Sequence, residues 1–253
     1  MNIVFVTQND SFYLPTTMEF LIKNIPHECN LVGVVVLSPS PFGKKLSFAG
    51  KLVQTFSVFG LRFGVYYGLK LIWTKIFGKD VVSVLKTHGL TPTYLDGNIN
   101  SEQSLEVIRK LKPELMISVQ ANEIFKSDLL QIAPLGTLNL HTSLLPKYRG
   151  LMPTFWVLKN GERTTGVSVF FVDEGIDSGP ILVQREVNIG NKSQAQLIKD
   201  TKALGAECII EAITKVRDGS LKLKENKDSD MSYFQFPTKD DVAQFRTSGA
   251  RFF

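Results

Sequence analysis

Five short apolar runs in the first half of the chain constrain its fold more than any other feature. The first begins at Ile3, and the others cover residues 31–37, 91–95, 115–119 and 137–140. Helical patterns separate the runs, at residues 16–23, 44–86 and 102–111. Strands that are apolar on both faces and alternate with helices form parallel sheets covered on both sides. We therefore expect an α/β fold with a Rossmann-like, open, mainly parallel sheet.

The pattern changes after Gly166. Two segments with alternating apolar residues, 167–172 and 181–187, flank a turn-rich stretch. This arrangement predicts a hairpin added to the sheet.

The C-terminal part of the chain is expected to begin with a long helix. Ser193 is the expected N-cap, and Gly219 the expected stop. Residues 222–230 are charged and predict a solvated linker. A Pro-Thr-x-x-Asp sequence at Pro237 then predicts a final helix within an aromatic-rich segment.

Composition limits the number of domains and the kinds of partner. The chain has 253 residues, 43% of them hydrophobic, which suffices for one large core. We expect a core over residues 1–220, with a helical insertion at about 40–86, and a C-terminal extension over 221–253. The net charge of +5 favours anionic partners without predicting a nucleic-acid-binding stripe. Two distant cysteines and the absence of a signal-peptide pattern predict a cytoplasmic protein without structural zinc.

The insertion is rich in phenylalanine and tyrosine over residues 44–77. Its glycines recur every four residues, at Gly60, Gly64 and Gly68. Arg62, Lys70 and Lys75 interrupt the apolar stretch around these glycines, so we expect no transmembrane span. Three interpretations remain open, in order of preference: packing on the core, a dimer surface, and peripheral contact with a membrane.

The residues richest in potential chemistry follow the fifth apolar run. Asn139 and His141 are two apart in a predicted strand, so their side chains share one face at its carboxyl end. A carboxamide N–H can stabilise an oxyanion, and an imidazole can move a proton near neutral pH. Equally, both residues could simply cap the strand end. A second polar cluster, at 173–180, is either part of the same site or an ordinary acidic turn.

Three motifs carry a resemblance to a known family. They are residues 139–153 (NLHTSLLPKYRGLMP), 165–169 (TGVSV) and 173–182 (DEGIDSGPIL). In this order and spacing they resemble the folate-dependent formyltransferases, which include methionyl-tRNA, glycinamide ribonucleotide and nucleotide-sugar N-formyltransferases. The resemblance extends over roughly residues 1–200 in its order of elements.

The resemblance implies formyl transfer from N10-formyltetrahydrofolate to an amine through a tetrahedral intermediate. Asn139 would donate a hydrogen bond to the oxyanion. His141 would relay the proton, and Asp177 would orient the imidazole. The reaction needs no metal.

The resemblance also implies a group of folate-binding residues, and position and charge predict a second group that binds the acceptor. The folate would lie against the segment after the fourth strand and the hairpin loop, at Asn122, Glu123, Ile124, Phe125, Val172, Asp173, Glu174, Gly175 and Ile176. The acceptor would contact the first strand end, the catalytic loop and the C-terminal segment, at Gln8, Asn9, Asp10, Lys147, Tyr148, Arg149 and Tyr233. Core packing for the apolar members and solvation for Lys147 and Arg149 remain the simpler alternatives.

Departures from individual branches narrow the expected acceptor. The first strand is followed by residues 8–12 (QNDSF), without the glycines of a phosphate loop. The segment after the core is short for the C-terminal barrel of the methionyl-tRNA enzymes, and the chain begins at the first strand, without the N-terminal domain of the hydrolase relatives.

We therefore expect a homodimer that formylates the amino group of a nucleotide-linked amino (dideoxy)sugar, as in lipopolysaccharide O-antigen synthesis, without a nucleic-acid partner. One alternative is formylation of an aminoacyl group on methionyl-tRNA or a carrier. Another is a non-catalytic module that binds folate or a nucleotide sugar.

Overall fold

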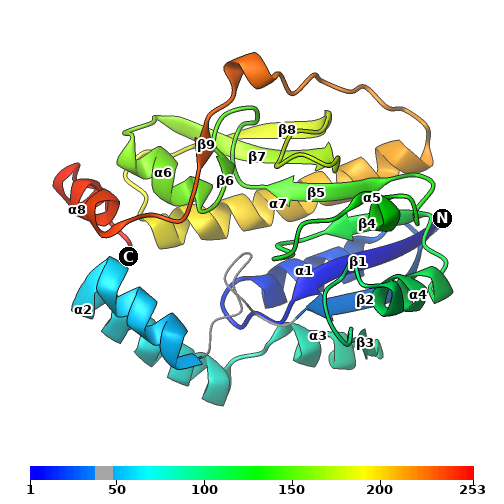
Figure 1. Ribbon diagram of the computed structural model, residues 1–253, viewed down its shortest axis with the longest axis horizontal. Coiled ribbons are helices and arrows are strands. Elements are labelled where there is room, and N and C mark those ends of the chain that lie inside the picture. Colours follow the sequence, from blue (N-terminus) through cyan, green and yellow to red (C-terminus); the bar gives the residue numbers. More distant parts are fainter. Residues whose placement is uncertain (38–47) are drawn as a thin grey trace.

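The computed structural model describes residues 1–37 and 48–253. Within them, a seven-stranded sheet has the order β3-β2-β1-β4-β5-β7-β8 (Figure 1). Its strands are β1 (Asn2–Gln8), β2 (Asn30–Leu37), β3 (Pro92–Thr93), β4 (Leu115–Ser118), β5 (Thr137–His141), β7 (Thr164–Phe171) and β8 (Ile181–Asn188). The first five strands are parallel, and the β7–β8 hairpin adds two antiparallel strands beside β5. The predicted α/β class and the added hairpin are confirmed.

Helices cover both faces of this sheet, as the apolar strands require. In β1, Ile3 and Phe5 pack on one side, and Val4 and Val6 on the other. The first side is covered by α1 (Leu14–Asn24), α3 (Val81–Thr87) and α7 (Gln194–Arg217). The second side is covered by α4 (Glu102–Lys110) and α5 (Ser127–Leu130). All parallel strands therefore end at one edge, where their following loops meet.

The expected helical block at 44–86 is two helices, α2 (Phe48–Phe77) and α3, and its first residues lie outside the described part of the chain. The division has a local cause. Asp80 caps α3, since its carboxylate accepts a hydrogen bond from the backbone N–H of Ser83 at 2.8 Å. Within α2, Gly60 has a φ of +79°, which kinks the helix at a residue without a Cβ.

The C-terminal segment folds back over the molecule. It comprises a short 3-10 helix, η1 (Asp228–Asp230), the strand β9 (Tyr233–Phe234) and the helix α8 (Lys239–Thr247). β9 pairs in parallel with β6 (Arg149–Gly150), which lies between β5 and α6 (Pro153–Lys159). We call residues 222–236 the strap. Figure 1 shows it, in orange, crossing over the β7–β8 hairpin to reach β6.

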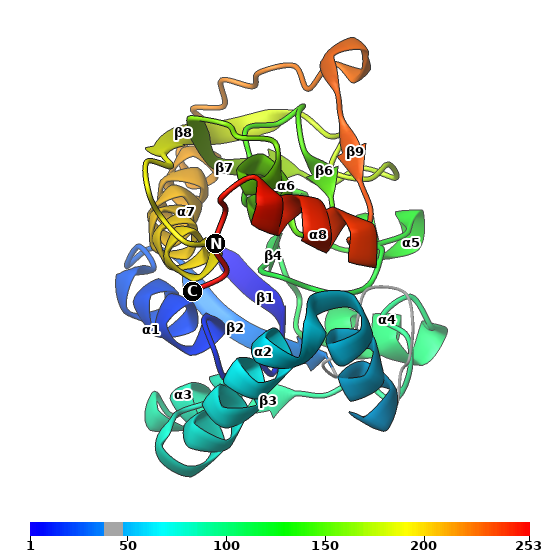
Figure 2. The ribbon, with the colours of Figure 1, turned by 90° about the vertical axis from the view of Figure 1, so that its left-hand side faces the viewer.

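An aromatic cluster joins the strap, α8, α6 and α2. Phe155 stacks on Phe245, whose ring in turn stacks on Phe252 at a centroid distance of 4.4 Å. Phe59 and Phe63 of α2 meet Phe252 edge-on. Figure 2 shows the result, with α2 and α8 lying next to each other at the surface that faces the viewer. The insertion and the C-terminal extension therefore share one small core.

The predicted ends of the last two helices are found. Ser193 and Thr238 form capping boxes at the starts of α7 and α8, and Gly219 has a φ of +67° just after α7. The interpretation of residues 222–230 as a solvated linker is wrong in part. Lys224 bridges to β8 and Asn226 is 7% exposed, because the strap docks on the core. Among the described residues, no helix is long and apolar enough to cross a membrane.

Candidate active site

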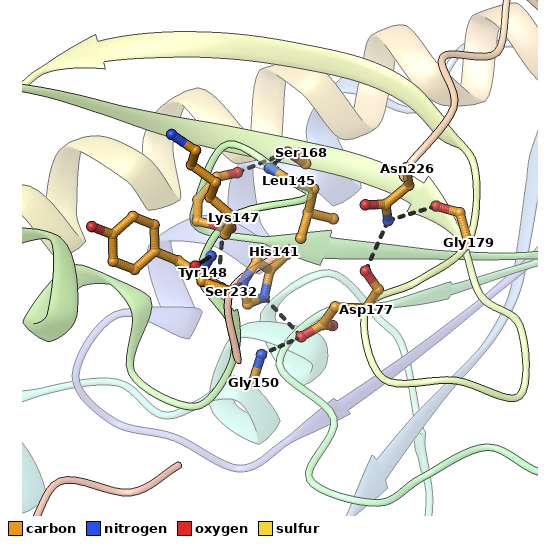
Figure 3. A network of polar contacts seen from close by, with 11 residues as sticks. His141, Leu145, Lys147, Tyr148, Gly150, Ser168, Asp177, Gly179, Asn226 and Ser232 are labelled. Atoms are coloured by element: carbon orange, nitrogen blue, oxygen red, sulfur yellow. Dashed lines mark hydrogen bonds and ion pairs between the residues drawn. The ribbon is translucent and has the colours of Figure 1, made fainter. Parts of the chain in front are cut away.

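His141 and Asp177 meet at the carboxyl end of β5 (Figure 3). The Nδ1 atom of His141 lies 3.5 Å from Oδ2 of Asp177, and both side chains are largely buried. Nε2 of the same ring lies 2.7 Å from the backbone oxygen of Tyr148. Both ring nitrogens thus face acceptors, and a ring protonated on both nitrogens donates to the two of them. The structure brings together two of the three predicted catalytic residues from segments that are 36 positions apart.

The loop that follows His141 is held against the hairpin by side-chain hydrogen bonds. The Ser168 hydroxyl donates to the Ser143 carbonyl at 2.7 Å and accepts from the Leu145 N–H at 3.2 Å. Gln184 of β8 donates to Ser168 and to the Leu145 carbonyl, both at 2.9 Å. These buried polar groups satisfy one another, so the loop has a defined shape without regular secondary structure.

Gly150 connects this loop to Asp177. Its N–H donates to Oδ2 of Asp177 at 2.8 Å, the same oxygen that faces His141. Its φ is +93°, and a Cβ there would lie 2.2 Å from the Phe234 carbonyl. Only glycine fits this conformation beside β9. Asp177 itself has a φ of +49°, and residues in this region often mark functional loops.

The strap supports both sides of the site through Asn226. Its Nδ2 donates to the backbone oxygens of Asp177, at 2.8 Å, and Gly179, at 2.9 Å. Its own carbonyl groups accept from the buried guanidinium of Arg149, which also pairs with Asp228 at 2.7 Å. The strap thus links the loop that carries Tyr148 and Gly150 with the loop that carries Asp177.

Asn139 lies one strand pleat before His141 on the same face of β5, and it is half-buried. Its carboxamide makes no side-chain hydrogen bond with the described residues, whereas the imidazole two positions on has two acceptors. Asn139 therefore retains donor capacity at the edge where ligands of parallel sheets bind.

The segments predicted to hold the folate lie close together. Ala121 and Phe125, which follow β4, pack on the same hydrophobic cluster as Val172, which follows β7. Ile124 is 50% exposed and Ile176 41%, so each segment offers an apolar side chain to a ligand.

Polar residues of both segments make hydrogen bonds within the protein. The Glu123 carboxylate accepts from the Ile99 N–H at 2.9 Å. The Asp173 carboxylate accepts from Ser178 and from the Gly175 N–H, which shapes the hairpin loop. Asn122, 8% exposed, lies in the same turn.

Several residues predicted to bind the acceptor have structural contacts instead. Arg149 is 4% exposed, and both terminal nitrogens of its guanidinium bind the strap, at Asp228 and Asn226. Tyr148 is stacked on Phe234 and donates to Glu162 at 2.6 Å, and burial raises its pKa to about 12. Asp10 accepts from the N–H groups of Tyr13 and Leu14, and so caps the start of α1.

The remaining predicted acceptor residues differ in exposure. Asn9 donates to Asp80 at 3.0 Å, which ties the end of β1 to α3. Gln8 is half-buried at the end of β1, and Tyr233 is 44% exposed in β9. Lys147 is exposed and borders a cavity of about 550 Å³ together with Glu186 and Lys224. The three predicted catalytic residues do not line that cavity.

One cation at this edge was not predicted from the sequence. Lys202 of α7 is removed from most solvent, and desolvation lowers its pKa to about 8, while the nearby carboxylate of Asp10 acts in the opposite direction. No short motif marks Lys202 or Asn226. Both positions become apparent only when α7 and the strap are placed against the strand ends.

Comparisons with known proteins agree with this arrangement. Residues 74–213 match the family model described as Formyl transferase. A methionyl-tRNA formyltransferase of Kosmotoga olearia is 34% identical over 169 residues, which cover 66% of this chain and 54% of that protein. One from Thermotoga maritima is 31% identical over 243 residues, covering 96% of this chain and 67% of that protein. The chain thus spans about half the length of several curated relatives it matches, such as the first of these.

The chain belongs to the formyl transferase family, whose enzymes use formyltetrahydrofolate as the formyl donor. A solved N-formyltransferase from Helicobacter canadensis, in complex with folinic acid and dTDP-3-aminofucose, has the same fold. It is 16% identical, with a TM-score of 0.60, and the match covers 98% of this chain and 80% of that one.

Proposed function

We propose that this protein transfers the formyl group of N10-formyltetrahydrofolate to a primary amine, with Asn139, His141 and Asp177 as the catalytic residues. The observation that carries the proposal is the contact of His141 with Asp177 beside the unengaged carboxamide of Asn139. It lies at the strand edge where this fold class binds ligands.

The residues fit the folate through the two apolar segments that meet beside β4 and β7. The bound cosubstrate supplies the formyl carbon and, at N10, a leaving group that must be protonated. The amine attacks that carbon, and the carbonyl electrons move onto oxygen. Asn139 then donates to this oxyanion, a type of interaction whose removal costs about 3–4 kcal/mol in transition-state stabilisation.

The reaction transfers one proton from the attacking amine to N10 as the carbon–N10 bond breaks. His141 is positioned to carry it, and Asp177 stabilises the imidazolium formed on the way. Nε2 of His141 is engaged by the Tyr148 carbonyl, so the ring must exchange one protein acceptor for a substrate nitrogen during the transfer. The Gly150 N–H holds the Asp177 carboxylate in place during that exchange.

Sequence relatives favour an aminoacyl amine, as on methionyl-tRNA, as the acceptor. The two relatives described above, at 34% and 31% identity, carry that name, whereas a solved N-formyltransferase in complex with a nucleotide sugar is similar in fold at 16% identity. This revises the expectation of a nucleotide-linked sugar and of no nucleic-acid partner in favour of the alternative. The net charge of +5 suits a tRNA or a nucleotide diphosphate equally.

The test is an absorbance assay for tetrahydrofolate release with N10-formyltetrahydrofolate and three acceptors: methionyl-tRNA, a panel of dTDP- and UDP-linked amino sugars, and glycinamide ribonucleotide. Asn139→Ala and His141→Ala serve as the inactive controls. Turnover with methionyl-tRNA that both variants abolish is the expected result. Turnover only with a sugar would restore the first expectation, and folate binding without turnover on any of these acceptors would contradict the proposal.

A further inference from the structure

Helix α2 exposes an unusual number of large apolar side chains. Six of them recur at helical spacing from residue 61 to residue 76 and are between 48% and 73% exposed: Leu61, Val65, Leu69, Ile72, Trp73 and Ile76. We call this set the α2 apolar face. At 1.5 Å per residue it runs for about 23 Å along the helix. Phe77, at its end, is 71% exposed. Contiguous apolar surface of this kind on a folded protein marks an interaction site.

The opposite side of the same helix is already occupied. Phe63 and Tyr67 stack with each other, and Phe59 and Phe63 pack on Phe252. Burial raises the pKa of Tyr67. The apolar face is therefore not needed to hold α2 on the protein, and it points away from the packed side.

The charged residues of α2 itself are all cationic. Residues 29–79 contain seven lysines or arginines and no aspartate or glutamate. Arg62, Lys75 and Lys79 are exposed on or just after α2. The nearest acidic residue along the chain, Asp80, is engaged in capping α3 and in a hydrogen bond with Asn9. A partner that meets the face must therefore be apolar at its centre and anionic at its border.

We propose that the α2 apolar face docks on a membrane surface rich in anionic lipid. A helix lying in the interface buries its apolar side chains among the acyl chains while its cations contact the headgroups, and tryptophan and phenylalanine favour that depth. Figure 2 shows α2 along the outside of the molecule, where a flat surface can reach it. The contact is peripheral and does not span the membrane.

Two other partners fit this surface less well. Two copies of this chain that pair α2 with α2 would bring the cations of both helices together, without an acidic residue on the helix to compensate them. An RNA would find basic residues there, but the aliphatic side chains that make up most of the face donate nothing to phosphates. Both partners are outcomes that the test distinguishes.

The test measures co-sedimentation of the whole chain with vesicles of phosphatidylcholine, with and without phosphatidylglycerol. We expect binding to the mixed vesicles only, and a blue shift of Trp73 fluorescence that Trp73→Phe abolishes. Trp156, the other tryptophan, is 6% exposed and supplies a constant background. The double variant Ile72→Asp/Ile76→Asp should bind at least tenfold more weakly. The matched variant Leu221→Asp/Leu223→Asp, on similarly exposed leucines outside α2, should bind as the wild type does.

The variant Arg62→Gln/Lys75→Gln tests the contribution of charge. We expect each lost cation to weaken binding to the mixed vesicles by about fivefold. Thermal unfolding of every variant establishes that it is folded. Absence of vesicle binding, equal binding to neutral vesicles, or binding that the α2 variants do not change would each overturn the proposal. So would a dimer in sedimentation that Ile72→Asp/Ile76→Asp dissociates, or loss of tRNA binding in that variant with no effect on vesicles.

Discussion

The catalytic loop and helix α2 are both covered by the C-terminal segment, yet they use their side chains in opposite ways. Ser168 of β7 and Gln184 of β8 hold the loop between β5 and α6 at Ser143 and Leu145, and the Asn139 carboxamide in β5 makes no side-chain hydrogen bond with the described residues. In α2, one side packs on aromatic rings and the other side exposes a row of apolar residues. Beside the loop, the feature available to a ligand is a hydrogen-bond donor, the Asn139 carboxamide. On α2, it is an exposed apolar surface.

The comparison shows where a substitution should affect the reaction and where it should affect only stability. Residues of this loop lie at or within one hydrogen bond of the proposed catalytic residues His141 and Asp177. Residues on the packed side of α2 and the buried residues of α8 contribute to stability through burial. Exposed residues of α2 are expected to affect neither the reaction nor stability.

The largest effect is expected from His141→Ala. Loss of a positioned proton carrier lowers kcat/KM by about 10³-fold. The melting temperature should stay close to that of the wild type, because His141 does not belong to the hydrophobic core clusters. Steady-state kinetics with the accepted amine, beside a thermal melt, measure both. A variant with near-normal turnover would exclude His141 as the proton carrier.

Phe245→Ala breaks the aromatic cluster that joins α8 to α6. Phe245 is fully buried against Phe155 and Phe252, so its truncation leaves a cavity and costs about 3–5 kcal/mol of unfolding free energy. Phe77→Ala, at an aromatic residue that is 71% exposed on α2, is the matched control and should change stability by less than about 0.5 kcal/mol. Chemical denaturation measures both. Equal effects would mean that the extension does not share the core.

Asn226→Asp tests whether the strap positions Asp177. The substitution keeps the shape of the side chain and removes the Nδ2 donor to the carbonyls of Asp177 and Gly179. We expect kcat to fall by about tenfold, or about 1.4 kcal/mol, because the loop that carries Asp177 loses both hydrogen bonds and faces a carboxylate instead. The pH profile of kcat should also shift, because the carboxylate beside His141 moves.

Lys227→Ala, at the exposed neighbour of Asn226, controls for a general effect on the strap. A thermal melt of both variants separates positioning from stability. If Asn226→Asp leaves kcat and its pH profile unchanged, Asn226 only anchors the strap.

The smallest effect is expected from Lys202→Met. Desolvation lowers the pKa of Lys202 to about 8 from 10.5, and the side chain keeps some solvent contact, so we expect a gain of about 1–2 kcal/mol in stability at neutral pH. Below pH 8 the lysine is charged in both states, and the folded state bears the full cost of burying it. Between the two pKa values the unfolded state binds more protons, so wild-type stability rises with pH there.

The advantage of Lys202→Met should therefore be greatest below pH 8 and decrease toward pH 10.5. Lys75→Met, at an exposed lysine of α2, is the control and should show no such dependence. Urea denaturation at several pH values measures the difference. A constant advantage across this range would mean that the pKa of Lys202 is the same in the folded and unfolded states.

Local patterns predicted much of the fold and the centre of the site. The alternation of apolar runs with helices specified the parallel sheet, and Ser193 and Thr238 marked helix starts through contacts within four residues. The motifs also named His141 and Asp177 before any distance was known. The prediction that a charged residue of the loop between β5 and α6 faces the acceptor was less successful for Arg149. Arg149 was expected to face the acceptor and is instead buried against Asn226 and Asp228.

The sequence by itself determined the elements and the chemistry, because caps, strand periodicity and a reactive motif depend on residues close together in the chain. Only the tertiary structure decided which of these groups have hydrogen-bond partners and which side chains are buried. Asn226 reaches Asp177 across 49 positions, and Phe63 reaches Phe252 across 189 positions. Whether Lys202 is desolvated, or one side of α2 is left uncovered, depends on such distant packing. No local pattern encodes it, since burial is a property of the assembled surface rather than of a segment.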